Sequence, residues 1–321
     1  MLTARPHGVQ TRRRRGACPA PHSGWDKPAA GPSGRGEAPV GPTPHNGTLM
    51  SLPGSDSRRP LTPPLALAVT ALGVAAMLGG PLLAQRLGLG LGLRSQVALG
   101  TVFLAIPALL ALIVLPAASR AAVGQPTVPV RTTALSVLLG AALWVGSIGL
   151  MEMQSLVFPP SAETLDLFRR LHAALAPSGV LDGLVSLTVI ALLPAVCEEL
   201  VMRGVLLPSL AARLGAAPAV LLTAAIFALI HLDPIRLLFT FVLGLLLGLL
   251  RLRTQSLWPP VVVHSTLNAL TFAIAPLVDD PAQAYTPQPA LGLVCLAVGT
   301  AVAWPLLRAL RPSVDSPWSA A

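Results

Sequence analysis

Residues 183–203 read GLVSLTVIALLPAVCEELVMR, in which fifteen uncharged residues run directly into Glu198 and Glu199. Water-soluble domains are about 25% charged residues. In this chain of 321 residues, charged residues make up only 11% and hydrophobic residues 53%. The composition excludes an ordinary soluble domain and indicates a protein whose main solvent is the lipid bilayer.

Similar apolar stretches lie on both sides of this one. A helix needs about 20 residues to cross a bilayer, and eight candidate spans lie at 62–86, 96–119, 132–153, 180–202, 216–232, 235–252, 257–277 and 289–308. Between the third and fourth, residues 161–176 place Leu and Phe at three- and four-residue spacing, which is typical of an amphipathic surface helix. We predict an all-α polytopic transmembrane bundle of about eight spanning helices plus one amphipathic interfacial helix.

The composition divides the chain into three parts. Residues 1–61 are rich in Pro, Gly, Ser and Arg without apolar periodicity, which predicts a disordered basic tail. Residues 62–311 are expected to form the transmembrane domain, and residues 312–321 a short C-terminal tail. Met50 precedes a shorter leader, so we hypothesise that translation begins there; detection of Met1 in the intact mass of the native protein would refute this.

Positive charge is concentrated in the N-terminal tail. Of the net charge of +9, residues 1–61 supply +6, from nine basic and three acidic side chains. A tail on the cytoplasmic side or against anionic lipid explains this charge, so no nucleic-acid partner is expected. Arginines also mark alternate connections between spans, which predicts that both termini are cytoplasmic. These arginines are Arg120, Arg131, Arg203, Arg213, Arg251, Arg253, Arg308 and Arg311.

Two adjacent carboxylates end the apolar run quoted above. Glu199 and Arg203 are four residues apart, which favours an ion pair on one helix face. Glu198 points about 100° away and has no partner in its own helix. An isolated carboxylate in such a place suits a general base. The alternative is that both acids are solvated where a helix ends in the lipid interface.

Two further polar positions lie within apolar helices, in FALIH (227–231) and HSTLN (264–268). A single intramembrane histidine is more often a hydrogen-bonded packing residue than a catalyst. However, Glu198 and His231 are both about 16 residues from a turn near 214–217, roughly 25 Å at 1.5 Å per residue. They are expected to face each other at equal depth if the helix continues past Arg203, a continuation that Pro208 opposes. Gly244 and Gly248 form a GxxxG spacing, which predicts a close helix contact within the bundle.

Together, these blocks resemble the EExxxR, FxxxH and HxxxN motifs of the CAAX prenyl protease and bacteriocin-processing (CPBP, or Abi) family of intramembrane proteases. They stand here as CEELVMRG (197–204), FALIH and HSTLN, in the order of the family and on separate predicted helices. The resemblance covers about residues 180–275. Met202 stands where the family commonly has an aromatic residue.

The resemblance implies hydrolysis of a peptide bond inside the membrane. Glu198 would activate a water molecule that His231 helps to hold. His264 and Asn268 would stabilise the oxyanion of the tetrahedral intermediate. Structural support of the site would come from Glu199, Arg203 and Phe227.

The sequence is compatible both with a zinc site and with a site that uses no metal. Glu198, His231 and His264 are the donor set of a His₂Glu zinc site with an open position, yet no HExxH is present. We favour a glutamate mechanism without a cofactor over a zinc mechanism. The competing functions are a non-catalytic membrane scaffold or immunity-type relative, and an ion-coupled transporter, for which no inverted repeat is visible.

The expected partners are the bilayer and a protein or peptide substrate with a membrane-associated C-terminal or processing segment. Arg, Ala and Gly are abundant, and Lys is nearly absent, which is typical of a bacterial genome of high GC content. We therefore expect a multi-pass protein of the bacterial cytoplasmic membrane.

Overall fold

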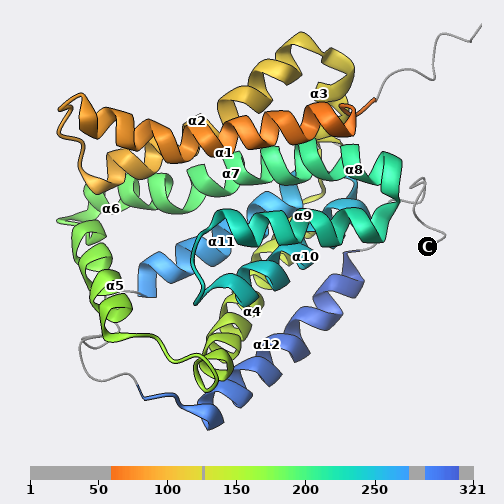
Figure 1. Cartoon of the computed structure of the whole chain (residues 1–321). Helices are drawn as coiled ribbons and strands as arrows, with labels where there is room; N and C mark the ends of the chain where they lie inside the picture. The colour runs from red at the N-terminus through yellow and green to blue at the C-terminus, as the bar shows by residue number, and fades with distance from the viewer. Residues whose placement is uncertain (1–58, 125–126, 275–285, 311–321) are drawn as a thin grey trace, which may run out of the picture. The chain divides into compact units, whose positions relative to one another are not determined.

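The computed structural model describes residues 59–124, 127–274 and 286–310, all within one unit of the chain, Leu52–Ala321. Apart from one isolated bridge between Gly124 and Ser256, these residues form helices and their connections, without a strand (Figure 1). This confirms the all-α prediction. The predicted tails, 1–61 and 312–321, lie outside the described residues except for 59–61.

The described residues form twelve α-helices, three of which are joined into one run by the π-helical segments η1 and η2. The helices are α1 (Pro63–Arg86), α2 (Leu93–Val114), α3 (Pro116–Val123), α4 (Val130–Ser155), α5 (Ala162–Leu175), α6 (Val180–Leu187), η1 (Thr188–Leu192), α7 (Leu193–Glu199), η2 (Leu200–Leu206), α8 (Leu207–Leu214), α9 (Ala216–Ile230), α10 (Leu237–Thr254), α11 (Trp258–Ile274) and α12 (Pro289–Ala309).

Six helical segments in the described part of the chain are long and apolar enough to cross a membrane: α1, α2, α4, the continuous run Val180–Leu214, α10 and α12. The apolar helices α9 and α11 have 15 and 17 residues. At 1.5 Å per residue, α9 is roughly 23 Å long and the described part of α11 roughly 26 Å, both shorter than the ~30 Å hydrocarbon core. The polytopic class is confirmed, and the count of about eight spanning helices is not.

The second span ends earlier than predicted. Helix α2 stops at Val114, and Leu115 adopts φ −119° and ψ 82° before α3 begins at Pro116. Proline disfavours helical backbone in the residue that precedes it and has no N–H to donate. The helix predicted at 96–119 is therefore divided in two at Pro116.

The run Val180–Leu214 continues past Arg203 in spite of Pro194 and Pro208. Each proline directly follows a π-helical segment and one leucine. Leu193 N–H donates to the Thr188 carbonyl, and Leu207 N–H donates to the Met202 carbonyl, both five residues back. The wider turn accommodates a proline, which cannot donate to the usual carbonyl four residues back. The helix therefore carries Glu198 and the buried Arg203 within the bundle, and Arg203 does not mark a membrane surface as its charge predicted.

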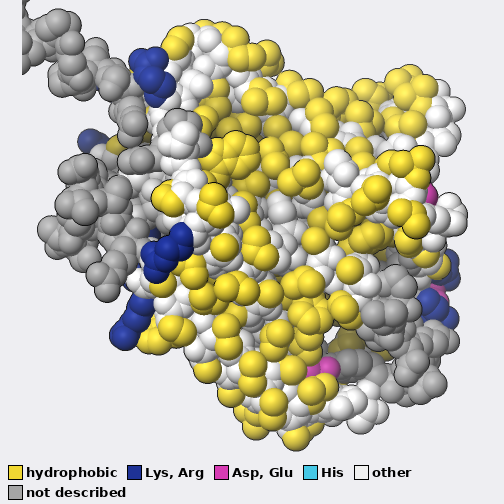
Figure 2. Space-filling view, turned by 180° about the vertical axis from the view of Figure 1, so that it is seen from behind, with side chains coloured by type: hydrophobic (Ala, Val, Ile, Leu, Met, Phe, Trp, Pro, Cys, Tyr) yellow, Lys and Arg dark blue, Asp and Glu magenta, His cyan; other side chains and the backbone are white. Residues whose placement is uncertain are grey.

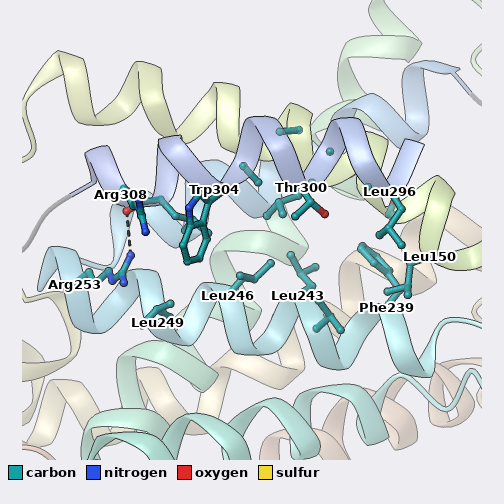
Figure 3. A pocket seen from close by; sticks show the side chains of 18 residues that line it. Leu150, Phe239, Leu243, Leu246, Leu249, Arg253, Leu296, Thr300, Trp304 and Arg308 are labelled. Carbon is teal, nitrogen blue, oxygen red and sulfur yellow. Dashed lines mark hydrogen bonds between the residues drawn. The ribbon is translucent and has the colours of Figure 1, made fainter. Parts of the chain in front are cut away.

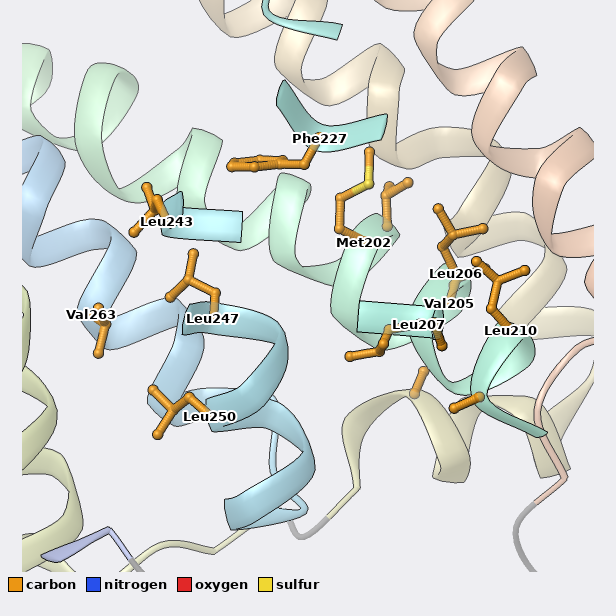
Figure 4. Packing of buried hydrophobic residues seen from close by; sticks show 14 of the residues in the cluster. Met202, Val205, Leu206, Leu207, Leu210, Phe227, Leu243, Leu247, Leu250 and Val263 are labelled. Atoms are coloured by element: carbon orange, nitrogen blue, oxygen red, sulfur yellow. The ribbon is translucent and has the colours of Figure 1, made fainter. Parts of the chain in front are cut away.

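The central part of this run is the core of the unit. Every residue from 201 to 207 is buried. Met202, Leu206 and Leu207 pack with apolar side chains of the surrounding helices, among them Phe227 of α9 and Leu247 of α10 (Figure 4). Glu198 and Glu199 therefore lie just before a fully buried stretch of this helix.

Close helix contacts position α10 against α9. A Cβ atom added to Gly244 would lie 2.9 Å from the Ala224 Cα, and one added to Gly248 would lie 3.1 Å from the Val220 Cγ1. These distances confirm that the GxxxG spacing serves a contact within the bundle.

Polar contacts tie the helix ends together at two levels. At one level, Arg251 donates to the Ala121 carbonyl (2.9 Å) and Arg253 to the Leu307 carbonyl (3.1 Å), which joins the ends of α3, α10 and α12. At the other, Gln154 donates to the Ile235 carbonyl (2.6 Å), which joins the end of α4 to the α9–α10 connection. When α9 and α11 are counted, the long helices run alternately from one level to the other, and the two levels lie toward the right and left of Figure 1.

Charge differs between these two levels. Among the described residues, the first level, here named the arginine end, has seven arginines and no acid: Arg59, Arg120, Arg131, Arg213, Arg251, Arg253 and Arg308. The second, the mixed end, has five arginines and five acids: Arg86, Arg94, Arg169, Arg170, Arg236, Glu152, Glu163, Asp166, Asp182 and Asp233. Figure 2 shows a broad hydrophobic face between an edge with basic side chains and an edge with both signs.

Candidate active site

Three side chains from three helices converge at one carboxylate oxygen. The Oε2 atom of Glu198, near the end of α7, lies 4.0 Å from His231 Nε2 and 3.9 Å from His264 Nε2. His231 follows α9 directly and His264 lies in α11. Glu198 Oε2 is buried and has no hydrogen-bond partner among the described residues. The equal-depth argument from the sequence therefore holds for Glu198 and His231.

The orientation of His231 is fixed by its own helix. Its Nδ1 lies 2.7 Å from the Phe227 carbonyl oxygen, one helical turn earlier. A carbonyl oxygen only accepts hydrogen bonds, so Nδ1 carries the hydrogen. In the neutral ring, Nε2 then presents its lone pair toward Glu198.

The orientation of His264 depends on a fully buried ion pair. Arg203 Nη1 donates to Glu199 Oε1 at 2.8 Å, and neither side chain is exposed to solvent. His264 Nδ1 lies 2.9 Å from the same carboxylate oxygen. Because an ionised carboxylate only accepts, His264 also carries its hydrogen on Nδ1 and directs Nε2 toward Glu198. Glu199 therefore orients a histidine as well as neutralising Arg203.

Phe227 lies between these groups. The Arg203 guanidinium carbon is 4.5 Å from the centre of its ring, a cation–π distance. The rings of His231 and His264 approach it edge-on, with centroid distances of 4.8 and 5.8 Å. One aromatic side chain thus contacts both histidines and the arginine.

One contact of the site was not predicted. Arg203 Nη2 donates to the carbonyl oxygen of Gly244 at 3.1 Å. The glycine spacing in α10 predicted a close approach, but a backbone acceptor gives no signal in the side-chain sequence. The absence of a Cβ at Gly244 lets α10 pack against α9 beside the guanidinium.

Asn268 is placed differently from the other predicted site residues. It lies one turn after His264 on α11 and is half-buried. Within the described part of the chain it forms no hydrogen bond. The structure gathers Glu198, His231 and His264 around one point, and no contact within the described residues joins the Asn268 amide to them.

The separations of the side-chain atoms around Glu198 Oε2 can be compared with those that a bound water molecule and a bound zinc ion require. With both imidazoles in the neutral form, Glu198, His231 and His264 present three acceptors around one point, and a water molecule there can donate its two hydrogens to two of them. If two atoms lie 4 Å apart and a water oxygen lies about 2.8 Å from each, the angle between them at the water oxygen is roughly 90°. Tetrahedral zinc, with bonds of about 2.0–2.1 Å, places its ligand atoms roughly 3.3 Å apart. The side chains are of types that zinc accepts, and the two separations from Glu198 Oε2, 3.9 and 4.0 Å, exceed this value.

Fold and site together define a multi-pass membrane protein with a buried Glu–His centre. Residues 180–270 match the family model described as "Type II CAAX prenyl endopeptidase Rce1-like". This region is thus similar to Rce1-like CAAX prenyl endopeptidases, which agrees with the resemblance to the CPBP family and supports a protease. Searches of curated proteins and of solved structures found no match.

Proposed function

We propose that this protein is an intramembrane endopeptidase that hydrolyses a peptide bond of a membrane-associated protein or peptide by means of a water molecule activated by Glu198. The observation that carries the proposal is the convergence of Glu198 Oε2, His231 Nε2 and His264 Nε2 within 4.0 Å, two of them oriented by hydrogen bonds at Nδ1. The family match at residues 180–270 supports the same reaction class.

The reaction begins with water held between the Glu198 carboxylate and the two imidazoles. Glu198 takes a proton from this water while the water oxygen forms a bond to the carbonyl carbon of the substrate. The carbonyl oxygen becomes an oxyanion, and the proton on Glu198 then passes to the amide nitrogen. The C–N bond breaks, which releases one product with a new carboxylate and one with a new amine.

The oxyanion requires a hydrogen-bond donor, and Asn268 supplies one. Its side-chain amide carries two N–H groups and has no competing partner in the described chain. His264, one turn away on the same face of α11, donates from Nε2 when its ring is protonated. Donors of this kind act most strongly on charge that develops in the transition state.

The proposed mechanism uses no cofactor. The separations of 3.9 and 4.0 Å around Glu198 suit hydrogen bonds to water better than bonds to zinc. A zinc mechanism through Glu198, His231 and His264 remains the alternative, and it predicts loss of activity on chelation and recovery with added zinc. A scaffold or a transporter needs no such arrangement of Glu198 with two oriented histidines.

We place the protein in the bacterial cytoplasmic membrane with both termini in the cytoplasm. The arginine end holds seven arginines and no acid among the described residues, against five of each sign at the mixed end. Loops rich in arginine are retained on the cytoplasmic side. α1 begins and α12 ends at the arginine end.

Comparative membrane proteomics tests the function and can identify the substrate in the same experiment. The native strain is compared with strains that carry Glu198→Gln or, as a matched control, Glu152→Gln at the mixed end. We expect a peptide tail or processing segment that is retained only in the Glu198→Gln strain. Complete processing in both Glu198→Gln and His264→Ala strains would contradict the proposal.

A further inference from the structure

A cavity lies apart from the Glu–His centre, among α4, α10 and α12. Its volume is about 450 Å³, within the 300–1,000 Å³ range of small-molecule sites. The wall is largely aliphatic and aromatic. Leu243 of α10 lines the cavity. The next residue, Gly244, points its carbonyl to Arg203 on another side of the same helix. The cavity and the candidate active site therefore use different faces of α10.

The cavity is polarised along its length. Arg253 and Arg308 line one end, and Leu150, Phe239 and Leu296 line the other (Figure 3). Both arginines belong to the arginine end, and no Asp or Glu is among the described residues that line the cavity. It therefore combines an apolar interior with two positive charges at one end.

Existing contacts hold the two guanidinium groups in place and leave donors for a ligand. Arg253 donates one N–H group of its Nη1 to the Leu307 carbonyl at 3.1 Å (dashed in Figure 3), and the group has five N–H donors. The Arg308 guanidinium carbon lies 4.5 Å from the centre of the Trp304 ring. Trp304 is 57% exposed, as is usual for a tryptophan at the membrane interface.

We propose that this cavity binds an anionic phospholipid of the surrounding bilayer, with one acyl chain among the apolar side chains and the phosphate at Arg253 and Arg308. An acyl chain satisfies the apolar wall, which water fills poorly, and guanidinium groups bind phosphate through charge-assisted hydrogen bonds. Basic pockets between transmembrane helices at the cytoplasmic side suit such headgroups. The bound lipid connects α10, which supplies Gly244 to the active site, with α4 and α12.

The test measures lipid binding to the full-length protein, purified in neutral detergent, by native mass spectrometry. Dioleoyl phosphatidylglycerol is compared with dioleoyl phosphatidylcholine, which has the same acyl chains and no net charge. Two arginines near a membrane surface give a preference of roughly thirty-fold for the anionic lipid. Equal retention of the two lipids by the wild-type protein would overturn the proposal, whatever the behaviour of any variant.

Variants then locate the site. We expect Arg253→Gln/Arg308→Gln to lose the preference for phosphatidylglycerol, and Arg131→Gln/Arg213→Gln, which removes the same charge from the same end, to keep it. Thr300→Trp fills the cavity from an exposed lining position and should lower retention of both lipids. Equal losses in the two double variants would contradict the assignment, and so would a lipid-independent dimer that covers Trp304.

Discussion

Glu198 and Glu199 are neighbours with opposite surroundings. Glu199 Oε1 lies within 2.9 Å of both Arg203 Nη1 and His264 Nδ1, whereas Glu198 Oε2 has no hydrogen-bond partner in the described chain. Successive helical residues point about 100° apart, so Glu199 pairs with Arg203 while Glu198, the proposed base, faces the two histidines.

Glu198→Gln removes the base but retains the size of the side chain. We expect the rate of peptide-bond hydrolysis to fall by about 10²–10⁴-fold, the usual contribution of a general base, with an unchanged thermal unfolding midpoint. Cleavage of an identified substrate and unfolding in detergent are measured on the same preparation. A variant that keeps its full rate would remove Glu198 from the reaction.

Arg203→Met tests the buried ion pair between Glu199 and Arg203. It leaves the Glu199 carboxylate buried without its ion-pair partner, and breaking a buried pair costs about 3–5 kcal/mol. We expect a large decrease in the unfolding midpoint. The double variant Glu199→Gln/Arg203→Met should recover part of this loss, because it removes both charges. Additive effects of the two substitutions would mean that the pair is not coupled.

Asn268→Ala tests the proposed oxyanion donor. Loss of one such donor lowers kcat by about 10²–10³-fold. Because Asn268 is half-buried and has no partner within the described residues, the unfolding midpoint should change little. A decrease in stability with an unaltered kcat would instead assign Asn268 a packing role.

At the scale of elements, the site depends on helices that approach closely and continue through prolines. The hairpin of Val180–Leu214 and α9, with Gly215 at its turn, sets Glu198 opposite His231. The contact of α10 with α9 at Gly244 brings a backbone carbonyl to Arg203.

Gly244→Val tests the close contact between α10 and α9, because a Cβ atom at position 244 would lie 2.9 Å from the Ala224 Cα. Overpacking of this kind usually costs about 1–3 kcal/mol and here also displaces the acceptor of Arg203. We expect a lower unfolding midpoint and lower activity. The matched control is Gly79→Val in α1, where nothing lies within 4 Å of an added Cβ. Equal effects at the two glycines would show that the contact of α10 has no special importance.

The sequence predicted the positions of most helices but not the details of their backbone. Apolar run lengths located most helices, and counting residues from the 214–217 turn paired Glu198 with His231, since depth in a hairpin depends only on rise per residue. The π-helical segments could not be predicted, because the sequence does not show whether Pro194 and Pro208 end the helix or are accommodated by wider turns within it. The same holds for Gly244, whose carbonyl becomes a partner of Arg203 only through tertiary packing.

At the scale of the whole described unit, charge distinguishes the two membrane sides. The arginine end is expected in the cytoplasm by the positive-inside rule. This places Arg213 inside and Asp166 of the amphipathic helix α5 outside.

Single cysteines at these positions, in a chain without Cys18, Cys197 and Cys295, test the orientation. A membrane-impermeant maleimide applied to intact spheroplasts should label Asp166→Cys and not Arg213→Cys. Inverted vesicles should give the reverse pattern. The opposite result in both preparations would invert the topology.

The central claim is that Glu198, His231 and His264 hold one water molecule in a hollow within the membrane. An experimental structure of the protein in lipid nanodiscs, at a resolution that shows ordered solvent, tests it most directly. We predict one solvent peak at about 2.6–3.2 Å from Glu198 Oε2 and from the Nε2 atom of at least one of the two histidines. Side chains that lie apart, or a peak bonded at about 2.0–2.1 Å as zinc would be, would contradict it.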